Sequence, residues 1–364
     1  MLSKLFSPKK VFISFIAIFI LLGQNLSASQ SFSLKSSSVC NLHINGIELL
    51  TEVELGGEII GLQWSPDGQT LAVNTRNYYE NWIIIQFFTF SLEGNLSPSD
   101  FQIENARLVQ FNDNNIVVAL AGGTLEIWDI ADQSLSESFI LIEDFPTVRW
   151  SPYGYATNAN THLFAAIDTY PMIQVWDIPS GDLAYPWDGR LNGMNAGNQS
   201  LVQDGLAINA AGNTIAFADA QDETVYFWNM MDPPQIFRGD GHGIHEIEFN
   251  HSGTLLAISG FNDGFRLVDT TTYREVAFLE TISTFNSATT EIEFSQDDCL
   301  LIGADRDGQM EIWDIESKIS LLSIQAHFGM IGALSIHPVE WILASGSLSS
   351  EGSLKIWQLD LSSE

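Results

Sequence analysis

Short apolar runs, each followed by turn-forming residues, recur along the chain from about residue 46 onward. Runs of this length bounded by Gly, Pro, Asn, Asp or Ser predict β-strands rather than helices. Seven of them precede a turn that leads into another apolar run, and we interpret them as the first strands of a repeat: 59–64, 106–111, 147–150, 205–208, 244–249, 289–294 and 331–336.

A second series of strands follows these turns. Its members are rich in alanine and other small residues, which suits tight packing between neighbouring sheets. The pattern therefore predicts an all-β protein. The second strands are expected at 71–74, 116–121, 163–168, 214–218, 255–259, 300–304 and 342–345.

A third series reveals an internal repeat through its endings, most of which are a tryptophan followed by a polar residue. The endings are Trp128-Asp129, Trp176-Asp177, Trp228-Asn229, Val268-Asp269, Trp313-Asp314 and Trp357-Gln358. With Val268 in the place of one tryptophan, they lie 48, 52, 40, 45 and 44 residues apart. Propeller blades repeat at roughly 40–45 residues, so this spacing predicts a β-propeller. The first repeat is the weakest, because its third strand, 82–90, ends in Phe90-Ser91.

The repeat resembles the WD40 family over most of the chain after residue 46. Gly241-His242 matches that family's Gly-His pair, and Ala326-His327 stands at the same place in the last repeat. The Trp-Ser-Pro-Asp-Gly turn at 64–68 also occurs in TolB-like propellers, but the Trp-Asp endings favour WD40. The resemblance implies a seven-bladed β-propeller of four-stranded blades spanning residues 46–364.

The resemblance also implies how the ring closes. The sequence ends at Glu364, soon after the third strand of the last repeat, which leaves no fourth strand for that blade. In the family an N-terminal strand takes this place, so we expect 48–55 to be the outer strand of the last blade. Such pairing would remove sheet edges that favour aggregation.

Two sets of polar side chains resemble the hydrogen-bonding sets that fix the loops of WD40 blades. They are His242, Asp263 and Ser259, and His327, Ser345 and Trp357 with Glu351 near the usual aspartate position. Catalysis by a Ser-His-Asp group requires an exposed serine and an oxyanion site, so we interpret both sets as structural and expect no catalytic residue. The other expected anchors of the repeat are Trp128, Asp129, Trp176, Asp177, Trp228, Trp313 and Asp314.

The first residues are interpreted as a targeting segment. Lys4, Lys9 and Lys10 precede an apolar run at 11–22 that contains one serine, and small residues follow around Ala28. This is the layout of a cleaved signal peptide, and the apolar run is short for a membrane span. We expect a signal peptide at 1–28, a linker at 29–45 and an exported protein that is secreted, periplasmic or on the cell surface, without a membrane span. An uncleaved anchor is the alternative.

The charge restricts the partners. The chain carries 45 acidic and 14 basic residues, a net charge of −31, and loss of three lysines with the signal peptide would bring it to about −34. Such a polyanion repels nucleic acid and anionic membrane surfaces. It favours cationic partners or divalent ions, or it serves only to keep the protein soluble.

Two cysteines, Cys40 and Cys299, are too few for a disulfide scaffold or a zinc cluster. The WD40 resemblance implies that outer strands run from the bottom face of the ring to its top face, which places Cys40 at the bottom. Cys299 follows a bottom-face turn in the adjoining sixth repeat. We therefore expect a Cys40–Cys299 disulfide, and two free thiols are the alternative.

No metal site or cofactor is expected. His245 and His251 lie at opposite ends of one predicted strand, roughly 20 Å apart at about 3.3 Å per residue, so one ion could not bind both. The stretch 303–314 resembles a calcium loop only faintly, because its first ligand position is Gly303, and Asp307-Gly308 is more typical of a turn between strands.

Long loops carry the candidate partner-binding residues. These are Tyr78 and Tyr79 in 75–81, Tyr185, Trp187 and Arg190 in 184–204, and Phe285 in 281–287. The resemblance places the first two loops on the top face. Exposed aromatics and arginine are typical interface anchors, although they could instead cover the base of their own loops.

These observations predict an exported, non-catalytic WD40 propeller that binds a protein or peptide through its top-face loops. One alternative is an extracytoplasmic propeller enzyme, or a protein that binds a ligand or ion at the mouth of the central channel, which converging carboxylates would favour. Another is a subunit of a larger envelope assembly.

Overall fold

The computed structural model describes residue 40 and residues 42–77, 79–141, 155–158, 160–167, 173–186, 201–219, 223–232, 234–239, 244–260, 264–281 and 289–363. These residues belong to one compact unit, Cys40–Glu364. Nowhere in these ranges is there a helix long and apolar enough to cross a membrane.

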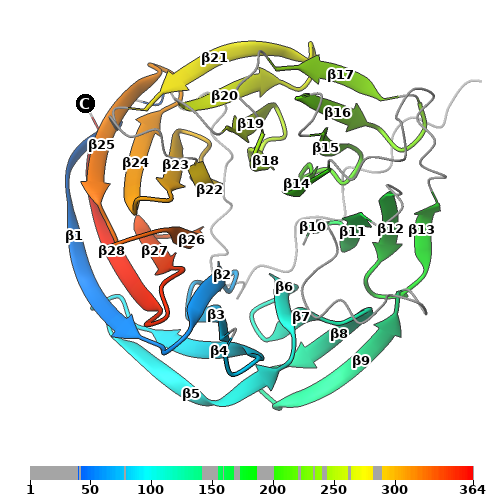
Figure 1. Cartoon of the computed structure of the whole chain (residues 1–364), viewed down its shortest axis with the longest axis vertical. Coiled ribbons are helices and arrows are strands. Elements are labelled where there is room, and N and C mark those ends of the chain that lie inside the picture. Colours follow the sequence, from blue (N-terminus) through cyan, green and yellow to red (C-terminus); the bar gives the residue numbers. More distant parts are fainter. Residues whose placement is uncertain are drawn as a thin grey trace, which may run out of the picture. The chain divides into compact units, whose positions relative to one another are not determined.

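The described residues form seven four-stranded antiparallel sheets, which are the blades of a β-propeller (Figure 1). Blades 1 to 3 are β2 (Glu58–Trp64), β3 (Thr70–Asn77), β4 (Trp82–Phe90) and β5 (Leu96–Glu104); β6 (Arg107–Phe111), β7 (Ile116–Ala121), β8 (Thr124–Asp129) and β9 (Ser134–Ile140); and β10 (Tyr155–Asn158), β11 (Leu163–Ile167), β12 (Ile173–Asp177) and β13 (Leu183–Pro186).

Blades 4 to 7 continue the ring. They are β14 (Leu201–Ile208), β15 (Ile215–Asp219), β16 (Thr224–Trp228) and β17 (Gln235–Arg238); β18 (Ile247–Phe249), β19 (Leu255–Ser259), β20 (Gly264–Asp269) and β21 (Arg274–Glu280); β22 (Thr289–Phe294), β23 (Leu300–Asp305), β24 (Gln309–Asp314) and β25 (Ile319–Gln325); and β26 (Ile331–Ile336), β27 (Ile342–Ser347), β28 (Ser353–Ser363) and β1 (Leu42–Glu54).

The antiparallel order of each blade defines two faces. Turns between first and second strands, and between third and fourth strands, lie on what we call the bottom face. Turns between second and third strands, and the connections from one blade to the next, lie on the top face. Any candidate binding loop therefore takes its face from its place in the blade.

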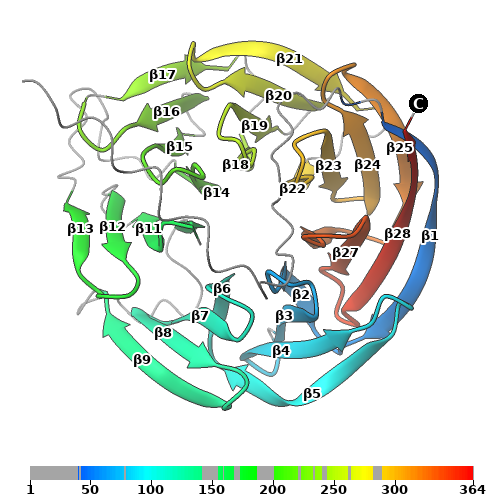
Figure 2. The same cartoon turned by 180° about the vertical axis from the view of Figure 1, so that it is seen from behind.

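The last blade is closed by the N-terminal strand, as predicted. Strand β1 pairs with β28 from Leu42 opposite Ser363 to Glu54 opposite Ser353. The two strands run side by side along the rim in both views (Figures 1 and 2). The pairing is longer than the predicted 48–55, and it covers the sheet edge that β28 would otherwise expose.

The third blade corrects one prediction. Its innermost strand is β10 (Tyr155–Asn158), which pairs with β11, and not the predicted 147–150, a segment outside the described residues. The turn-like Trp150-Ser151-Pro152-Tyr153-Gly154 sequence suggested the earlier position. In the structure, the Asn158 side chain begins the turn that leads into β11, because its Oδ1 accepts the Thr161 N–H at 3.0 Å.

The core lies between adjacent blades, where small residues let the sheets approach closely. Ile59, Leu71 and Val73 of blade 1 pack with Ala344 and Ile356 of blade 7. At Gly346 on β27, a Cβ would lie 2.3 Å from Cγ2 of Ile59. A larger residue there would force the two blades apart.

A disulfide joins Cys40 to Cys299, whose Cα atoms lie 5.4 Å apart. Cys299 is buried and directly precedes β23, in the bottom-face turn of blade 6, and the Cys40 N–H donates to Oε2 of Glu316 at 3.0 Å. The bond therefore ties the start of the closing strand to the neighbouring blade. It links residues 259 positions apart in the sequence.

Candidate functional site

Two aromatic side chains stand almost fully exposed on the top face. Phe328, in the connection from β25 to β26, is 98% exposed, and Tyr79, in the turn from β3 to β4, is 97% exposed. Exposed aromatic rings of this kind are common anchors in protein interfaces. They belong to blades that lie close together in the ring, because blade 7 follows the Phe328 connection and adjoins blade 1.

Contacts between loops connect the two positions. The Leu348 N–H donates to the Met330 carbonyl at 2.8 Å, which joins the Phe328 connection to the turn between β27 and β28. That turn meets the segment before β2, because the Gly56 N–H donates to the Glu351 carbonyl at 2.9 Å. A Cβ on Gly57 would lie 2.7 Å from the Trp82 ring, at the base of the Tyr79 turn.

We call this continuous region the loop surface; it comprises residues 328–330, 348–352, 56–57 and 79–82. Its acidic members Glu80 and Glu351 are exposed, and the Trp82 Nε1–H donates to Oε2 of Glu80 at 2.9 Å. Nearby, Nε of Arg76 forms an ion pair with Oε2 of Glu58 at 2.8 Å. The loop surface therefore combines apolar rings with acidic groups.

Local hydrogen bonds hold both aromatic residues in place. Oδ1 of Asn77 accepts the Tyr79 and Glu80 N–H groups at 3.0 and 3.1 Å, which fixes the turn. Before Phe328, the N–H groups of Ala326 and His327 donate to the Gly308 carbonyl at 2.9 and 3.1 Å. The rings thus project from backbone that is already ordered, which lowers the entropy cost of binding.

His327, Ser345 and Trp357 form one hydrogen-bonded set beneath Phe328. The Trp357 Nε1–H donates to Oγ of Ser345 at 2.8 Å, and Nε2 of His327 lies 2.7 Å from the same oxygen. Burial, and then the charge of Lys355, lower the pKa of His327 to about 4, so the imidazole is neutral at pH 7. Ser345 is fully buried, as expected of a structural anchor and not of a nucleophile.

The carboxylate near this set differs from the one suggested by sequence. Glu351 has an exposed side chain, whereas the charge of Glu52 on β1 favours the protonated form of His327. Glu52 lies 3.5 Å from Nζ of Lys355, which also donates to the Ala326 carbonyl at 2.9 Å. The closing strand therefore contributes a charge to the support of the loop surface.

None of the other predicted partner-binding residues is seen in a top-face loop of the described residues. Tyr185 lies in β13 opposite Val175, not in a loop, so the predicted loop 184–204 is wrong at both ends: β13 extends to Pro186 and β14 begins at Leu201. The remaining candidates, Tyr78, Trp187, Arg190 and Phe285, lie outside the described residues, as do the anchors His242 and Asp263. Phe328 was not predicted.

The aspartates of the Trp-Asp endings cap turns. Oδ1 of Asp129 accepts the Ala131 N–H at 2.9 Å, Oδ2 of Asp177 accepts the Ser180 N–H at 3.1 Å, and Oδ1 of Asp314 accepts the Ser317 N–H at 2.6 Å. Their tryptophans pack against or between blades, with Trp176, Trp228 and Trp313 buried and Trp128 partly exposed. These residues organise the repeat and leave the top face to the loops.

A channel site, the alternative considered above, would need carboxylates that converge on the channel mouth. The carboxylates of Glu246, Glu248 and Glu293 lie on or directly before the innermost strands β18 and β22 of blades 5 and 6. Oε2 of Glu246 accepts the Ile292 N–H at 2.8 Å, Glu248 accepts the Phe294 N–H, and Oε1 of Glu293 accepts the Ile336 N–H at 3.4 Å. Each acid thus contacts the backbone of the next blade. Among the described residues, no group of three or more His, Cys, Asp or Glu side chains could hold a metal ion.

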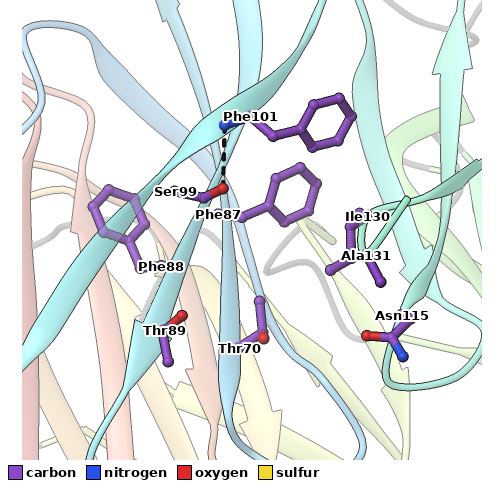
Figure 3. Close-up of a pocket in the computed structure, with 9 residues that line it drawn as sticks. All are labelled: Thr70, Phe87, Phe88, Thr89, Ser99, Phe101, Asn115, Ile130 and Ala131. Atoms are coloured by element: carbon purple, nitrogen blue, oxygen red, sulfur yellow. Dashed lines mark hydrogen bonds between the residues drawn. The ribbon is translucent and has the colours of Figure 1, made fainter. Parts of the chain in front are cut away.

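A small pocket lies on the bottom side of the seam between blades 1 and 2 (Figure 3). Its volume is about 180 Å³, and it is lined by Thr70, Phe87, Phe88, Thr89, Ser99, Phe101, Asn115, Ile130 and Ala131. The Phe87 and Phe101 rings are stacked, with centroids 5.8 Å apart. The pocket is separate from the loop surface, because its turns belong to the opposite face.

The sheet order defines a seven-bladed β-propeller, and the third strands of several blades end in Trp-Asp. No protein-family model matches the chain. The chain is similar to the WD repeat-containing protein 91 homolog of Dictyostelium discoideum, with 21% identity over 212 residues that cover 57% of this chain and 26% of that protein. The match thus spans about a quarter of that relative. Together with the fold, it supports the WD40 resemblance and, in general terms, a scaffold for protein interactions.

Proposed function

We propose that the protein is an exported, non-catalytic scaffold that binds a protein or peptide partner through the loop surface. The observation that carries this proposal is the pair of almost fully exposed rings, Phe328 and Tyr79, on ordered and connected top-face loops. Large exposed apolar side chains on a rigid support gain the most from burial against a partner.

The charge of the protein indicates the chemistry of the partner. Glu80 and Glu351 lie on the loop surface, and the whole chain has a net charge of −31. A segment that combines an apolar anchor with lysine or arginine would match this surface and would be attracted over a distance. We therefore propose a basic partner whose association weakens as the salt concentration rises.

Export and the absence of catalysis are part of the proposal. The signal-peptide pattern at 1–28 supports export, and the Cys40–Cys299 disulfide is compatible with an oxidising compartment. A buried Ser345 with a neutral His327 supports a structural role for the one anchor set that lies within the described residues.

The test compares partners captured from the native extracellular or periplasmic fraction by wild type and by a Tyr79→Ala, Phe328→Ala double variant. Met231→Ala is the matched control, because Met231 is 86% exposed but lies on the bottom face. A partner recovered with wild type is then purified, and its dissociation constant is measured against all three proteins. We expect the double variant to bind at least about 10-fold more weakly, equivalent to about 1.4 kcal/mol.

Two outcomes would overturn the proposal. One is a partner that binds the double variant and wild type equally. The other is a partner whose binding is weakened as much by Met231→Ala as by the double variant. Met231 lies on the bottom face, so such a partner would not bind specifically through the loop surface.

A further inference from the structure

An irregularity in the outer strand of blade 1 shapes the pocket between blades 1 and 2. Gln86 pairs with Gln102 and Phe88 with Pro98, so three residues, 99–101, lie opposite Phe87 alone. The corresponding shifts in blades 2, 3, 5 and 6 each add a single residue. Bulges re-aim side chains and are common beside functional sites.

The bulge is stabilised from within and directs an aromatic ring toward the pocket. Oγ of Ser99 accepts the Phe101 N–H at 3.1 Å, as the dashed line in Figure 3 shows. The Phe101 ring stacks on the Phe87 ring, with an angle of 9° between their planes. The centroid of the Phe101 ring lies 6.0 Å from that of the Trp128 ring of blade 2. The result is an apolar wall that joins two blades.

Neutral polar groups surround this wall. The side chains of Thr70, Thr89 and Asn115 line the pocket and make no hydrogen bond within the part of the chain that the structure describes. None of the nine lining residues is charged, in a protein whose net charge is −31. The pocket thus offers hydroxyl and amide groups next to aromatic carbon, and no ion-pairing partner.

We propose that this pocket binds one ring of a neutral carbohydrate. A pyranose presents C–H groups on one face, which suit a phenyl ring, and hydroxyls along its edge, which suit threonine and asparagine side chains. A purely apolar ligand would leave the polar groups unpaired, and an anion would be repelled by the protein's charge. At 180 Å³, the pocket is smaller than drug-sized sites of roughly 300–1,000 Å³, so it admits one ring and not a longer chain.

This inference is independent of the proposed function, because the pocket and the loop surface lie on opposite faces. A shallow site for one ring implies weak binding, with a dissociation constant on the order of a millimolar for a free monosaccharide. Tighter binding would require several such units on one glycan to engage several copies of the protein.

The test uses saturation-transfer difference NMR of the full chain with glucose, galactose, mannose and N-acetylglucosamine. Glucuronic acid and the open-chain polyol sorbitol serve as comparison ligands. We expect transfer to the ring C–H protons of at least one neutral sugar, with less transfer to glucuronic acid and none to sorbitol.

Matched variants identify the site. Ala131→Trp fills the pocket from the turn between β8 and β9. The control, Thr271→Trp, places the same ring at the equivalent turn between β20 and β21 of blade 5. The two turns are equivalent because Asp269 accepts the Thr271 N–H just as Asp129 accepts the Ala131 N–H. We expect Ala131→Trp to abolish transfer and Thr271→Trp to leave it unchanged. Asn115→Ala should weaken binding about five-fold, the loss of one hydrogen bond.

The inference is overturned if no neutral sugar shows transfer, if sorbitol shows as much as the sugars, or if transfer survives Ala131→Trp in a protein whose circular dichroism matches wild type. Loss of transfer in both tryptophan variants would also overturn it, because a site outside the pocket would then be responsible.

Discussion

Oε1 of Gln63 on β2 accepts a hydrogen bond from the Phe111 N–H on β6, 2.6 Å away, and thereby joins the innermost strands of blades 1 and 2. The same contact recurs elsewhere in the ring. Glu248 on β18 accepts the Phe294 N–H of the next blade, and Glu293 on β22 accepts the Ile336 N–H. All three acceptors occupy the position before the last apolar residue of their strand. Blades 5 and 6 therefore use a carboxyl group where blade 1 uses an amide.

The carboxyl version of this contact predicts a pH-dependent stability that Glu293→Gln removes. Burial raises the pKa of Glu293 from 4.5 to about 7. Between these two pH values the folded protein therefore keeps a proton on Glu293 that the unfolded chain has released. The stabilisation is complete below about pH 4.5 and is lost as the pH rises through about 7. Glutamine keeps the acceptor and needs no proton, so the variant should gain about 1–3 kcal/mol of unfolding free energy at pH 8 and little at pH 5.

Urea unfolding of both proteins at pH 5 to 8 measures this difference. The variant should also affect Glu248, whose pKa is raised by burial and then by the charges of Glu293 and Glu246. Glu137→Gln, on the exposed outer strand β9, is the control and should leave the pH profile unchanged. Parallel pH profiles for wild type and Glu293→Gln would show that Glu293 is not protonated in the folded protein.

Much of the ring could be predicted from the sequence because each blade repeats the same packing problem. Small residues on second strands and tryptophans on most third strands recur along the chain, and their spacing predicts a propeller repeat. The closing strand, in contrast, was implied by the WD40 resemblance. The third blade was misplaced because residues 150–154 imitate the turn of blade 1. The actual turn uses Asn158, whose role depends on its pairing with Leu163 on β11.

The candidate site was predicted only in part. Tyr79 was found because the sequence suggested a long loop at 75–81, although β3 extends to Asn77 and β4 begins at Trp82, so the turn is shorter than predicted. Phe328 was missed because the sequence did not mark the connection from β25 to β26 as an insertion, and loop length was the criterion. An aromatic residue directly after Ala326-His327 was the signal that could have identified it. The sequence also shows Gln63, Glu248 and Glu293 as polar residues within predicted apolar strands, but it does not show what they contact. Their partners lie on the next blade, which is a property of the ring and not of any local pattern.

Reduction of the Cys40–Cys299 disulfide should destabilise the closure of the ring. The bond links positions 259 residues apart, and its loss frees the start of β1 from blade 6. We expect a decrease of about 2–5 kcal/mol in the free energy of unfolding when reductant is added to wild type. Denaturant unfolding measures the loss, and intact mass should rise by two hydrogens under the same conditions.

The control for this experiment is a Cys40→Ser, Cys299→Ala double variant. It should have the lower stability of the reduced protein and should not respond to reductant. An unchanged mass on reduction of wild type would contradict the disulfide itself. An unchanged stability despite the mass change would show that the pairing of β1 with β28 suffices for closure.

Ser345→Ala should loosen the support of Phe328. The substitution leaves the Trp357 Nε1–H and Nε2 of His327 buried without their shared partner, which costs about 1–3 kcal/mol. Because His327 precedes Phe328, the backbone N–H groups of 327–330 should also exchange with deuterium faster than in wild type. Ser136→Ala is the control, since Ser136 on β9 is exposed and its side chain makes no hydrogen bond to the residues that the structure describes, and such surface changes stay within about 0.5 kcal/mol. If Ser345→Ala loses stability but the exchange of 327–330 is unchanged, the set anchors the blade without ordering the loop surface, and the entropic advantage inferred for partner binding would not hold.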